Sequence, residues 1–257
     1  MSKSKFLSFK LLFFVLFLLL LALAFYFVRG QERQSLPPPV EGQPVVALES
    51  EKVDVSKEKA KISPTPKEEA LPFEFNLDIP FTSQAPHAIW DAVHEQTCEE
   101  AAVLMVARYF KKQKIDGPDD AEEELQKLIA WQKEKFGFFE DTTALETARI
   151  LSEYYGLKTQ ILEKPTVQQI KKEVVAHHPV VAPANGRELK NPFFKQPGPI
   201  YHMLVIKGYT SDKFITNDPG TRKGADFVYK YDVLMEAIHD WTGEDASGPA
   251  RVIVVQN

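Results

Sequence analysis

The sequence predicts an α+β domain in which a buried central helix packs on an antiparallel sheet. Helical periodicity dominates the chain from Cys98 to His177, and strand-like patterns dominate it after Pro179. The stretch from Cys98 to Lys112 is apolar on most faces, which is typical of a helix inside a core. The 257 residues include one cysteine, so an apolar core, and not a disulfide, must hold the fold.

Four helical segments are expected before the strands, and a short one near the C-terminus. Thr97 is a candidate N-cap for the first helix, and Glu100, three residues later, would complete a capping box. Gly156 is placed to end the third helix, since glycine commonly follows the last helical residue. The expected ranges are Cys98–Lys112, Asp119–Lys135, Thr142–Tyr155, Thr166–His177 and Asp232–Trp241.

The strands follow from short apolar runs bounded by turn residues. The segments "YHMLVIKGY" and "KFITND" are separated only by "TSD", which predicts a β-hairpin. The runs "PVVAPA", "ADFVYKY" and "ARVIVVQN" predict three further strands.

The N-terminal segment differs sharply from the rest. It is apolar from Leu11 to Val28, roughly 27 Å of helix at about 1.5 Å per residue, against a bilayer core of about 30 Å. Three lysines precede this run and only Arg29 follows it closely, so the positive-inside rule puts the N-terminus in the cytoplasm. We predict that residues 1–29 are a single-pass anchor in the cell membrane, with the domain outside. A secreted protein is the alternative, because Ala22–Ala24 resembles a signal-peptide cleavage site.

Composition assigns the remaining segments and excludes several partners. Residues 30–72 are rich in proline and mixed charge, which predicts a disordered linker, and residues 73–257 form the globular domain. A net charge of -5 and a pI near 5.8 argue against nucleic acid as a partner. The chain shows no nucleotide-binding loop and no zinc-ligand spacing among its histidines, so we expect no nucleotide, metal or other cofactor.

Cys98 lies where a thiol can become reactive. At the first turn of a helix the backbone N–H groups are unpaired and the helix dipole is positive, and both favour a thiolate. Glu99 and Glu100 oppose this if they face the sulfur, but side chains diverge by about 100° per residue, so at least one should face elsewhere. The alternative is a small buried hydrophobe, the usual role of a lone cysteine on an apolar helix.

The predicted hairpin brings two further polar residues together. His202 opens its first strand and Asp218 closes the return strand. Cross-strand neighbours lie about 5 Å apart, close enough for a carboxylate to orient an imidazole. Taken singly, His202 could be a half-buried sheet histidine and Asp218 a turn-capping aspartate. The thiol, the imidazole and the carboxylate are nevertheless each expected at the end of a predicted helix or strand.

These segments resemble a known family. "LDIPFTSQAP", "CEEAAVLMVARYF", "YHMLVIKGY" and "FITNDPGT" are similar to the bacteriocin-processing, double-glycine-leader peptidase-like proteins, family thirty-nine of the papain-like cysteine peptidases. The resemblance covers roughly residues 77–255 and implies a papain-like fold. It implies Cys98 as nucleophile, His202 as general base and acid, Asp218 as the residue that orients the histidine, and no metal. Gln84 matches the glutamine that helps to line the oxyanion hole.

The chain departs from the family pattern in two respects. Gln84 lies farther from Cys98 than expected, so the insert "APHAIWDAVHEQT" must loop out if Gln84 is to reach the sulfur. Gln96 is nearer in sequence, but a side chain only two residues from Cys98 would be poorly placed to help line the oxyanion hole. The processing peptidases are also fused to transporter and ATPase domains and face the cytoplasm, whereas this chain has one predicted anchor and an outward orientation. Leader removal during export is therefore not the expected role.

The long loop before His202 and the insert before Cys98 would form the walls of a cleft. Trp90, Phe193, Phe194 and Tyr201 are candidates for contact with a peptide or protein substrate, with covering the core as the alternative role. The sequence thus predicts an anchored, outward-facing cysteine peptidase. The alternatives are an amidase or transpeptidase acting on cell-wall or other peptides, and a papain-like binding module without activity.

Overall fold

The computed structural model describes residues 70–257. The predicted membrane anchor and almost all of the predicted linker lie outside the described residues. Between residues 70 and 257 there is no helix with the length and apolar character needed to cross a membrane.

A seven-stranded sheet forms the centre of this domain, and all of its neighbouring strands run antiparallel. The strand order is β2-β7-β3-β4-β5-β6, with the short β1 also paired to β4. The strands are β1 (Phe75–Asn76), β2 (Lys158–Glu163), β3 (Val180–Asn185), β4 (Tyr201–Tyr209), β5 (Lys213–Asn217), β6 (Phe227–Lys230) and β7 (Arg251–Gln256). The α+β class and the antiparallel sheet are confirmed.

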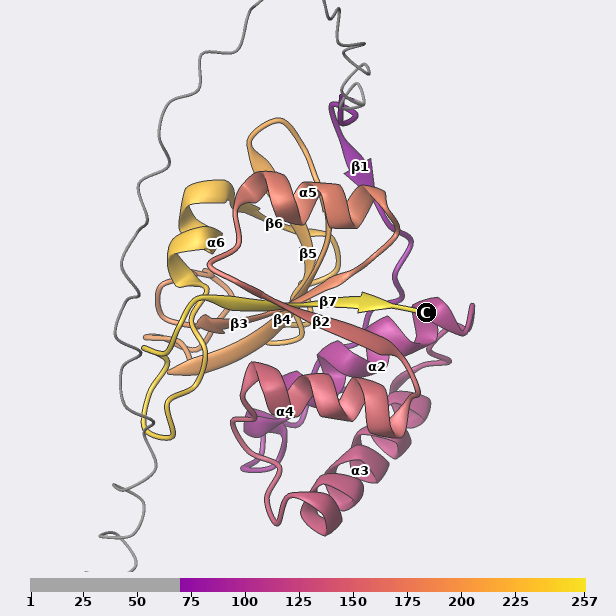
Figure 1. The fold of residues 1–257 in the computed structure, drawn as a ribbon. Helices are drawn as coiled ribbons and strands as arrows, with labels where there is room; N and C mark the ends of the chain where they lie inside the picture. Colours follow the sequence, from indigo (N-terminus) through magenta and orange to yellow (C-terminus); the bar gives the residue numbers. More distant parts are fainter. Residues whose placement is uncertain (1–69) are drawn as a thin grey trace, which may run out of the picture. The chain divides into compact units, whose positions relative to one another are not determined.

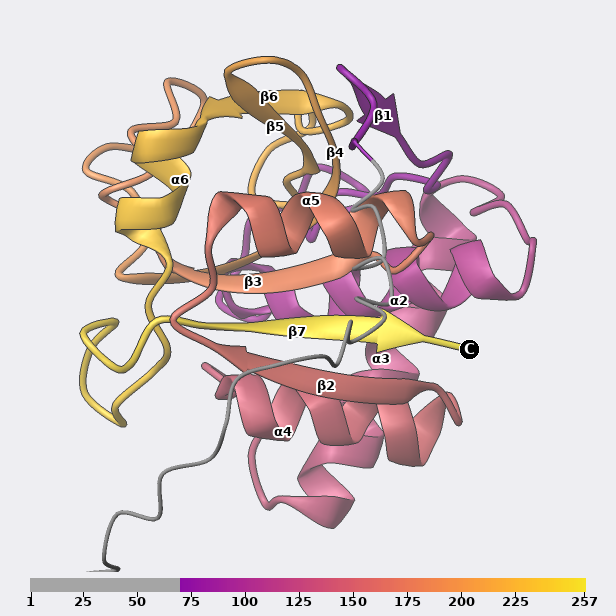
Figure 2. The same ribbon diagram turned by 45° about the horizontal axis from the view of Figure 1, so that its top comes forward.

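Helices cover both faces of the sheet (Figure 1). One face is covered by α2 (Cys98–Phe110), α3 (Pro118–Lys135) and α4 (Ala144–Arg149), which continues into a π-helical turn, η2 (Ile150–Tyr154). The other face is covered by α5 (Val167–Val175) and α6 (Tyr231–Ala237), and Figure 2 shows α5 next to β3. A 3-10 turn, η1 (His94–Gln96), precedes α2.

The core lies between α2 and the central strands. Every residue of α2 from Cys98 to Ala107 is buried, and so is every residue of β4. Alanines at 101, 102 and 107 keep the α2 surface small, which lets the helix approach the sheet closely. The predicted buried central helix is confirmed, and its first residue meets β4 where the polar pair of the hairpin is found.

Two expectations about the elements were wrong. Neither β1 nor β2 was expected, and β2 places a strand between the helical segments. Its residues alternate between exposed and half-buried, as at the edge of a sheet, so the stretch carries only a weak apolar signal. The predicted capping box at Thr97 is also absent. The Thr97 hydroxyl donates to the backbone oxygens of Gln84 (2.8 Å) and His94 (3.3 Å), while Glu100 turns into the core. Capping boxes form instead before α4 and α5.

Candidate active site

The hairpin joins His202 to Asp218. His202 is the second residue of β4, and Asp218 directly follows β5. The His202 Nε2 atom lies 2.8 Å from Asp218 Oδ1, and both side chains are almost completely buried. The second carboxylate oxygen, Oδ2, accepts hydrogen bonds from the Asn191 side-chain amide (3.0 Å) and the Tyr229 hydroxyl (2.5 Å). Asp218 is therefore saturated with donors, and its position is fixed from three sides.

This environment keeps Asp218 ionised. Burial acts to raise the pKa of its carboxyl, but His202, the Tyr229 hydroxyl and the Gly220 backbone N–H outweigh burial and hold the pKa below its usual value. Gly220 also allows the close packing of the pair, because a Cβ there would lie 2.8 Å from His202 Cε1. Phe194 packs edge-on against the imidazole, with ring centroids 5.1 Å apart. With Nε2 engaged by Asp218, Nδ1 is the ring nitrogen left for proton exchange.

Cys98 begins α2 and its side chain lines a cleft together with His202. Its thiol does not pair with the imidazole. The Sγ atom donates to Glu99 Oε2 at 3.0 Å, and within residues 70–257 no hydrogen bond joins it to His202. Burial, and then the neighbouring Glu99 and Glu100 carboxyls, raise the pKa of the thiol well above its usual value. Burial and like charge therefore oppose the thiolate that the helix N-terminus would favour.

The two glutamates after Cys98 are both buried. Glu99 accepts the thiol at Oε2 and the Thr142 backbone N–H at Oε1 (3.0 Å). Glu100 faces α3, as expected of at least one of the pair, and accepts a hydrogen bond from the Gln132 amide. Burial raises the pKa of Glu100 to about 8, although the Gln132 bond works in the other direction. Glu100 is therefore largely a neutral acid at pH 7.

The Gln84 side chain returns to the cysteine. Residues 85–93 loop out, and the Thr97 hydroxyl binds the Gln84 carbonyl. The Gln84 Nε2 donates to the His94 carbonyl (2.8 Å), which uses one of its two protons, and the side chain lines the cleft beside Cys98. Gln96 lines the same cleft. Gln84 therefore lies on the same cleft as Cys98, and its side-chain Oε1 is buried without a hydrogen-bond partner in the described part of the chain.

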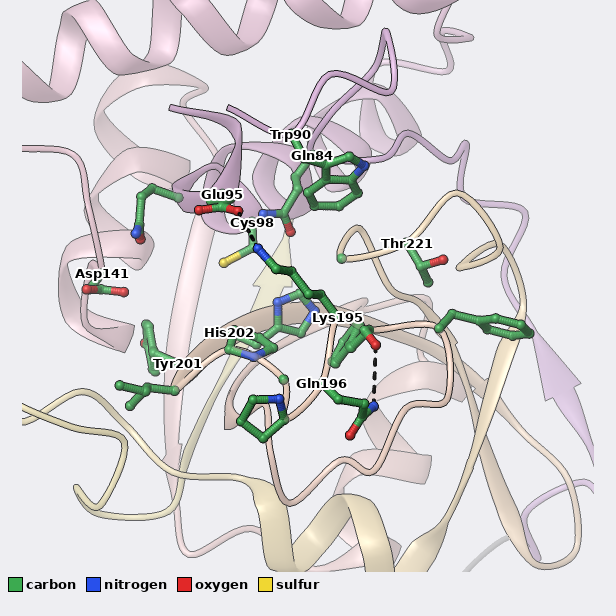
Figure 3. Close-up of a pocket in the computed structure, with 18 of the residues that line it drawn as sticks. Gln84, Trp90, Glu95, Cys98, Asp141, Lys195, Gln196, Tyr201, His202 and Thr221 are labelled. Carbon is green, nitrogen blue, oxygen red and sulfur yellow. Dashed lines mark hydrogen bonds and ion pairs between the residues drawn. The ribbon is translucent and has the colours of Figure 1, made fainter. Parts of the chain in front are cut away.

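The cleft has a volume of about 970 Å³ and runs across Cys98 and His202 (Figure 3). All four predicted substrate contacts line it, but they differ in exposure. Trp90 and Phe193 are 42% and 45% exposed, so they are open to a ligand. Phe194 and Tyr201 are buried, and the Tyr201 hydroxyl donates to the Thr142 carbonyl (2.9 Å). Phe194 and Tyr201 therefore support the wall of the cleft from inside the domain and offer little surface to a ligand.

Charged residues of both signs line the cleft, and Lys195 Nζ lies 3.8 Å from the Glu95 carboxylate there. Asp141 lies beyond Cys98 on the side of Tyr201, and Thr221 lies at the other end (Figure 3). Arg222 and Lys223 follow Thr221 in the chain and also line the cleft. The sequence indicated neither these charged residues of the cleft nor the supporting Asn191 and Tyr229. No spacing pattern points to them, because they meet Asp218 from separate elements. Within residues 70–257 no cluster of His, Cys, Asp and Glu could hold a metal ion.

The comparisons with known proteins identify the family of the chain. The model of the Peptidase_C39 like family matches residues 76–245. The chain belongs to this C39-like peptidase family. A crystal structure described as a C39-like peptidase from Bacillus anthracis is similar at 18% identity and a TM-score of 0.49, covering 72% of this chain and 98% of that chain. No curated protein matches the chain.

Proposed function

We propose that this C39-like protein is a cysteine peptidase that hydrolyses peptide bonds through an acyl-enzyme on Cys98. The observation that carries the proposal is the buried His202–Asp218 pair, held by Asn191 and Tyr229, on a cleft that also contains the only thiol of the chain. A donor-saturated carboxylate that orients one imidazole nitrogen is the arrangement used for nucleophilic catalysis.

Four residues carry out the steps of the proposed reaction. The Cys98 sulfur attacks the peptide carbonyl and forms a tetrahedral intermediate. The Cys98 backbone N–H and the remaining Gln84 amide proton donate to its oxyanion. His202 takes the thiol proton of Cys98 as the sulfur attacks and passes it to the leaving amine, and Asp218 keeps the imidazole oriented and stabilises its charged form. Water then releases the acyl group, with His202 acting as base.

The substrate is a peptide segment that fits an open groove. Trp90 and Phe193 offer half-exposed aromatic surface for apolar side chains. The N-terminal run from Leu11 to Val28 would place the domain outside the cell membrane, where extracellular or cell-envelope peptides are the available substrates. The linker over residues 30–72 would give the domain reach from the membrane surface.

A peptide-library digest with the full-length protein, beside Cys98→Ala and His202→Ala, tests this function. We expect cleavage by the wild type, and a loss of at least about a thousandfold in both variants, because residues of a triad act as a unit. Adding a competing amine and analysing the products separates hydrolysis from transpeptidation. Unchanged cleavage by Cys98→Ala would refute the thiol mechanism, and no cleavage by the wild type would favour a binding module.

A further inference from the structure

The His94 side chain connects the loop of residues 85–93 to helix α3. It is 11% exposed and lies between two carboxylates. Its Nδ1 atom is 2.8 Å from Asp91 Oδ1 on the loop, and its Nε2 atom is 2.9 Å from Glu122 Oε2 on α3. The other oxygen of Glu122 accepts a hydrogen bond from the Gln126 amide at 2.9 Å. The imidazole thus bridges the loop and α3 through its two nitrogen atoms.

The two carboxylates require a charged imidazole. An ionised carboxylate only accepts hydrogen bonds, so both ring nitrogens of His94 must carry a proton. Burial acts to lower the pKa of His94, but its hydrogen bonds to Glu122 and Asp91 outweigh burial and raise the pKa above its usual value. The His94 backbone N–H, and then its ring, lower the pKa of Asp91. The ring is therefore charged below about pH 6.5 and loses its charge as the pH rises through the raised pKa.

The bridge to α3 is weaker when the ring is neutral. A neutral imidazole has one N–H and one lone pair, so one nitrogen of His94 would face a carboxylate oxygen with no proton between them. A second ion pair also connects the loop to α3, since His87 Nε2 lies 3.2 Å from Asp119 Oδ1. Both of its side chains are exposed, and such pairs contribute little. Loss of the charge on His94 therefore frees the loop to move away from α3.

The backbone of His94 holds the Gln84 side chain. Its carbonyl accepts hydrogen bonds from Gln84 Nε2 at 2.8 Å and from the Thr97 hydroxyl at 3.3 Å. In the described part of the chain this is the one hydrogen bond of the Gln84 side chain, because its Oε1 has no partner. Gln84 and Trp90 line the cleft on the side that also carries Cys98 (Figure 3). A movement of the loop would therefore displace both side chains relative to the sulfur.

We propose that protonated His94 is a positioning residue of the peptidase, which holds the loop of residues 85–93 against α3 and so keeps Gln84 and Trp90 in place beside Cys98. The proposal rests on the peptidase function proposed above. His94 itself does not line the cleft, so it acts through the loop and not on the substrate. The loop is held in acidic and neutral solution and is released in alkaline solution.

The ratio of kcat/KM between the wild type and His94→Gln tests the proposal. Glutamine can donate a hydrogen bond but carries no charge at any pH. Both full-length proteins are assayed with one peptide that the wild type cleaves, and the ratio cancels the titration of the catalytic groups that both share. We expect a ratio of about ten or more below about pH 6.5, because small displacements of groups that bind the substrate or the oxyanion are costly. The ratio should fall toward one as the pH rises through the pKa of His94, and a ratio independent of pH would overturn the proposal.

Glu122→Gln tests whether the charge of the ring is the cause. This variant keeps an oxygen for the imidazole but removes one of the two negative charges, so the pKa of His94 should fall by about one unit. The ratio of wild type to Glu122→Gln should be near one in acidic and in alkaline solution, and it should reach a maximum of about three between the two pKa values. A role of Glu122 in stability alone would give no such maximum, and its absence would count against the proposal.

His178→Gln and Glu173→Gln are the matched controls. His178 Nδ1 lies 2.9 Å from Glu173 Oε2, and this pair is at the end of α5, on the face of the sheet that α5 covers. Neither residue lines the cleft. Both variants should give ratios near one at every pH, whereas ratios like those of His94→Gln would show a general effect of histidine charge and overturn the proposal. Circular dichroism spectra at each pH establish that every variant is folded.

The cut that chymotrypsin makes after Trp90 measures the loop independently of peptidase activity. Below about pH 6.5 we expect this cut to form about tenfold faster in His94→Gln than in the wild type, because cleavage follows the population of the open loop. Equal rates would show that His94 does not hold the loop. If the wild type cleaves peptides and the kcat/KM ratio does not change with pH, the positioning role fails while the peptidase function stands. If the wild type cleaves no peptide, both proposals fail.

Discussion

The support of Asp218 by Tyr229 gives a prediction whose size follows from the structure. The Tyr229 hydroxyl donates to Asp218 Oδ2 at 2.5 Å, and both side chains are buried. In Tyr229→Phe this charge-assisted bond is lost, and water does not replace it because the site is closed. Hydrogen bonds to charged groups contribute about 1.5–3 kcal/mol, so we expect the free energy of unfolding at pH 7 to fall by about that amount.

The sign of the pH dependence follows from the lowered pKa of Asp218. A carboxyl whose pKa is depressed on folding adds stability above its unfolded pKa, and that stability is lost as the pH falls through the folded value. Tyr229→Phe removes part of the depression. The difference in the free energy of unfolding between variant and wild type should therefore be largest at pH 7. It should become smaller as the pH is lowered from about 4 toward 2.

Urea unfolding of the full-length protein at several pH values measures this gap. Tyr209→Phe is the control, because the buried Tyr209 hydroxyl donates to the neutral backbone carbonyl of Pro72 (3.0 Å). Tyr209→Phe should lower the free energy of unfolding by about 0.5–1.5 kcal/mol, and this decrease should not depend on pH in the same range. A Tyr229→Phe gap that is equally large at pH 7 and pH 2 would refute the reasoning, since the lost bond would then not depend on the charge of Asp218.

Two further predictions concern the packing around the site. In Gly220→Ala the new Cβ would lie 2.7 Å from Phe194 and 2.8 Å from His202, so the imidazole must move. Peptide turnover should fall by about a hundredfold, and an unchanged kcat would show that the ring tolerates the shift. Glu100 has a pKa of about 8 in the fold, above its unfolded value, so the protonated form favours folding and stability should fall as the pH rises from about 5 to 8. Glu100→Gln should flatten that slope in urea titrations, and an equal slope in both proteins would contradict a buried neutral Glu100.

The local sequence pattern was sufficient to predict the helix and the hairpin that have strong apolar periodicity. The apolar run after Cys98 could only be a buried helix, and the turn at residues 210–212 could only bring His202 and Asp218 to one end of a hairpin. These two predictions rest on interactions within a few residues or across one turn. β2 was missed because half of its residues face solvent at the edge of the sheet, where the apolar signal is weak.

The sequence by itself therefore determined the class of fold, the central helix and the residue types that meet in the site. Only the tertiary structure decided the directions of the side chains around the sulfur. Glu99 turns to Cys98 and Glu100 to Gln132 because the packing of α2 between β4 and α3 buries both carboxyls, and each must find a donor. Tyr229 and Asn191 reach Asp218 from distant segments for the same reason. Desolvation depends on everything that surrounds a group, so no local pattern in the chain could reveal it.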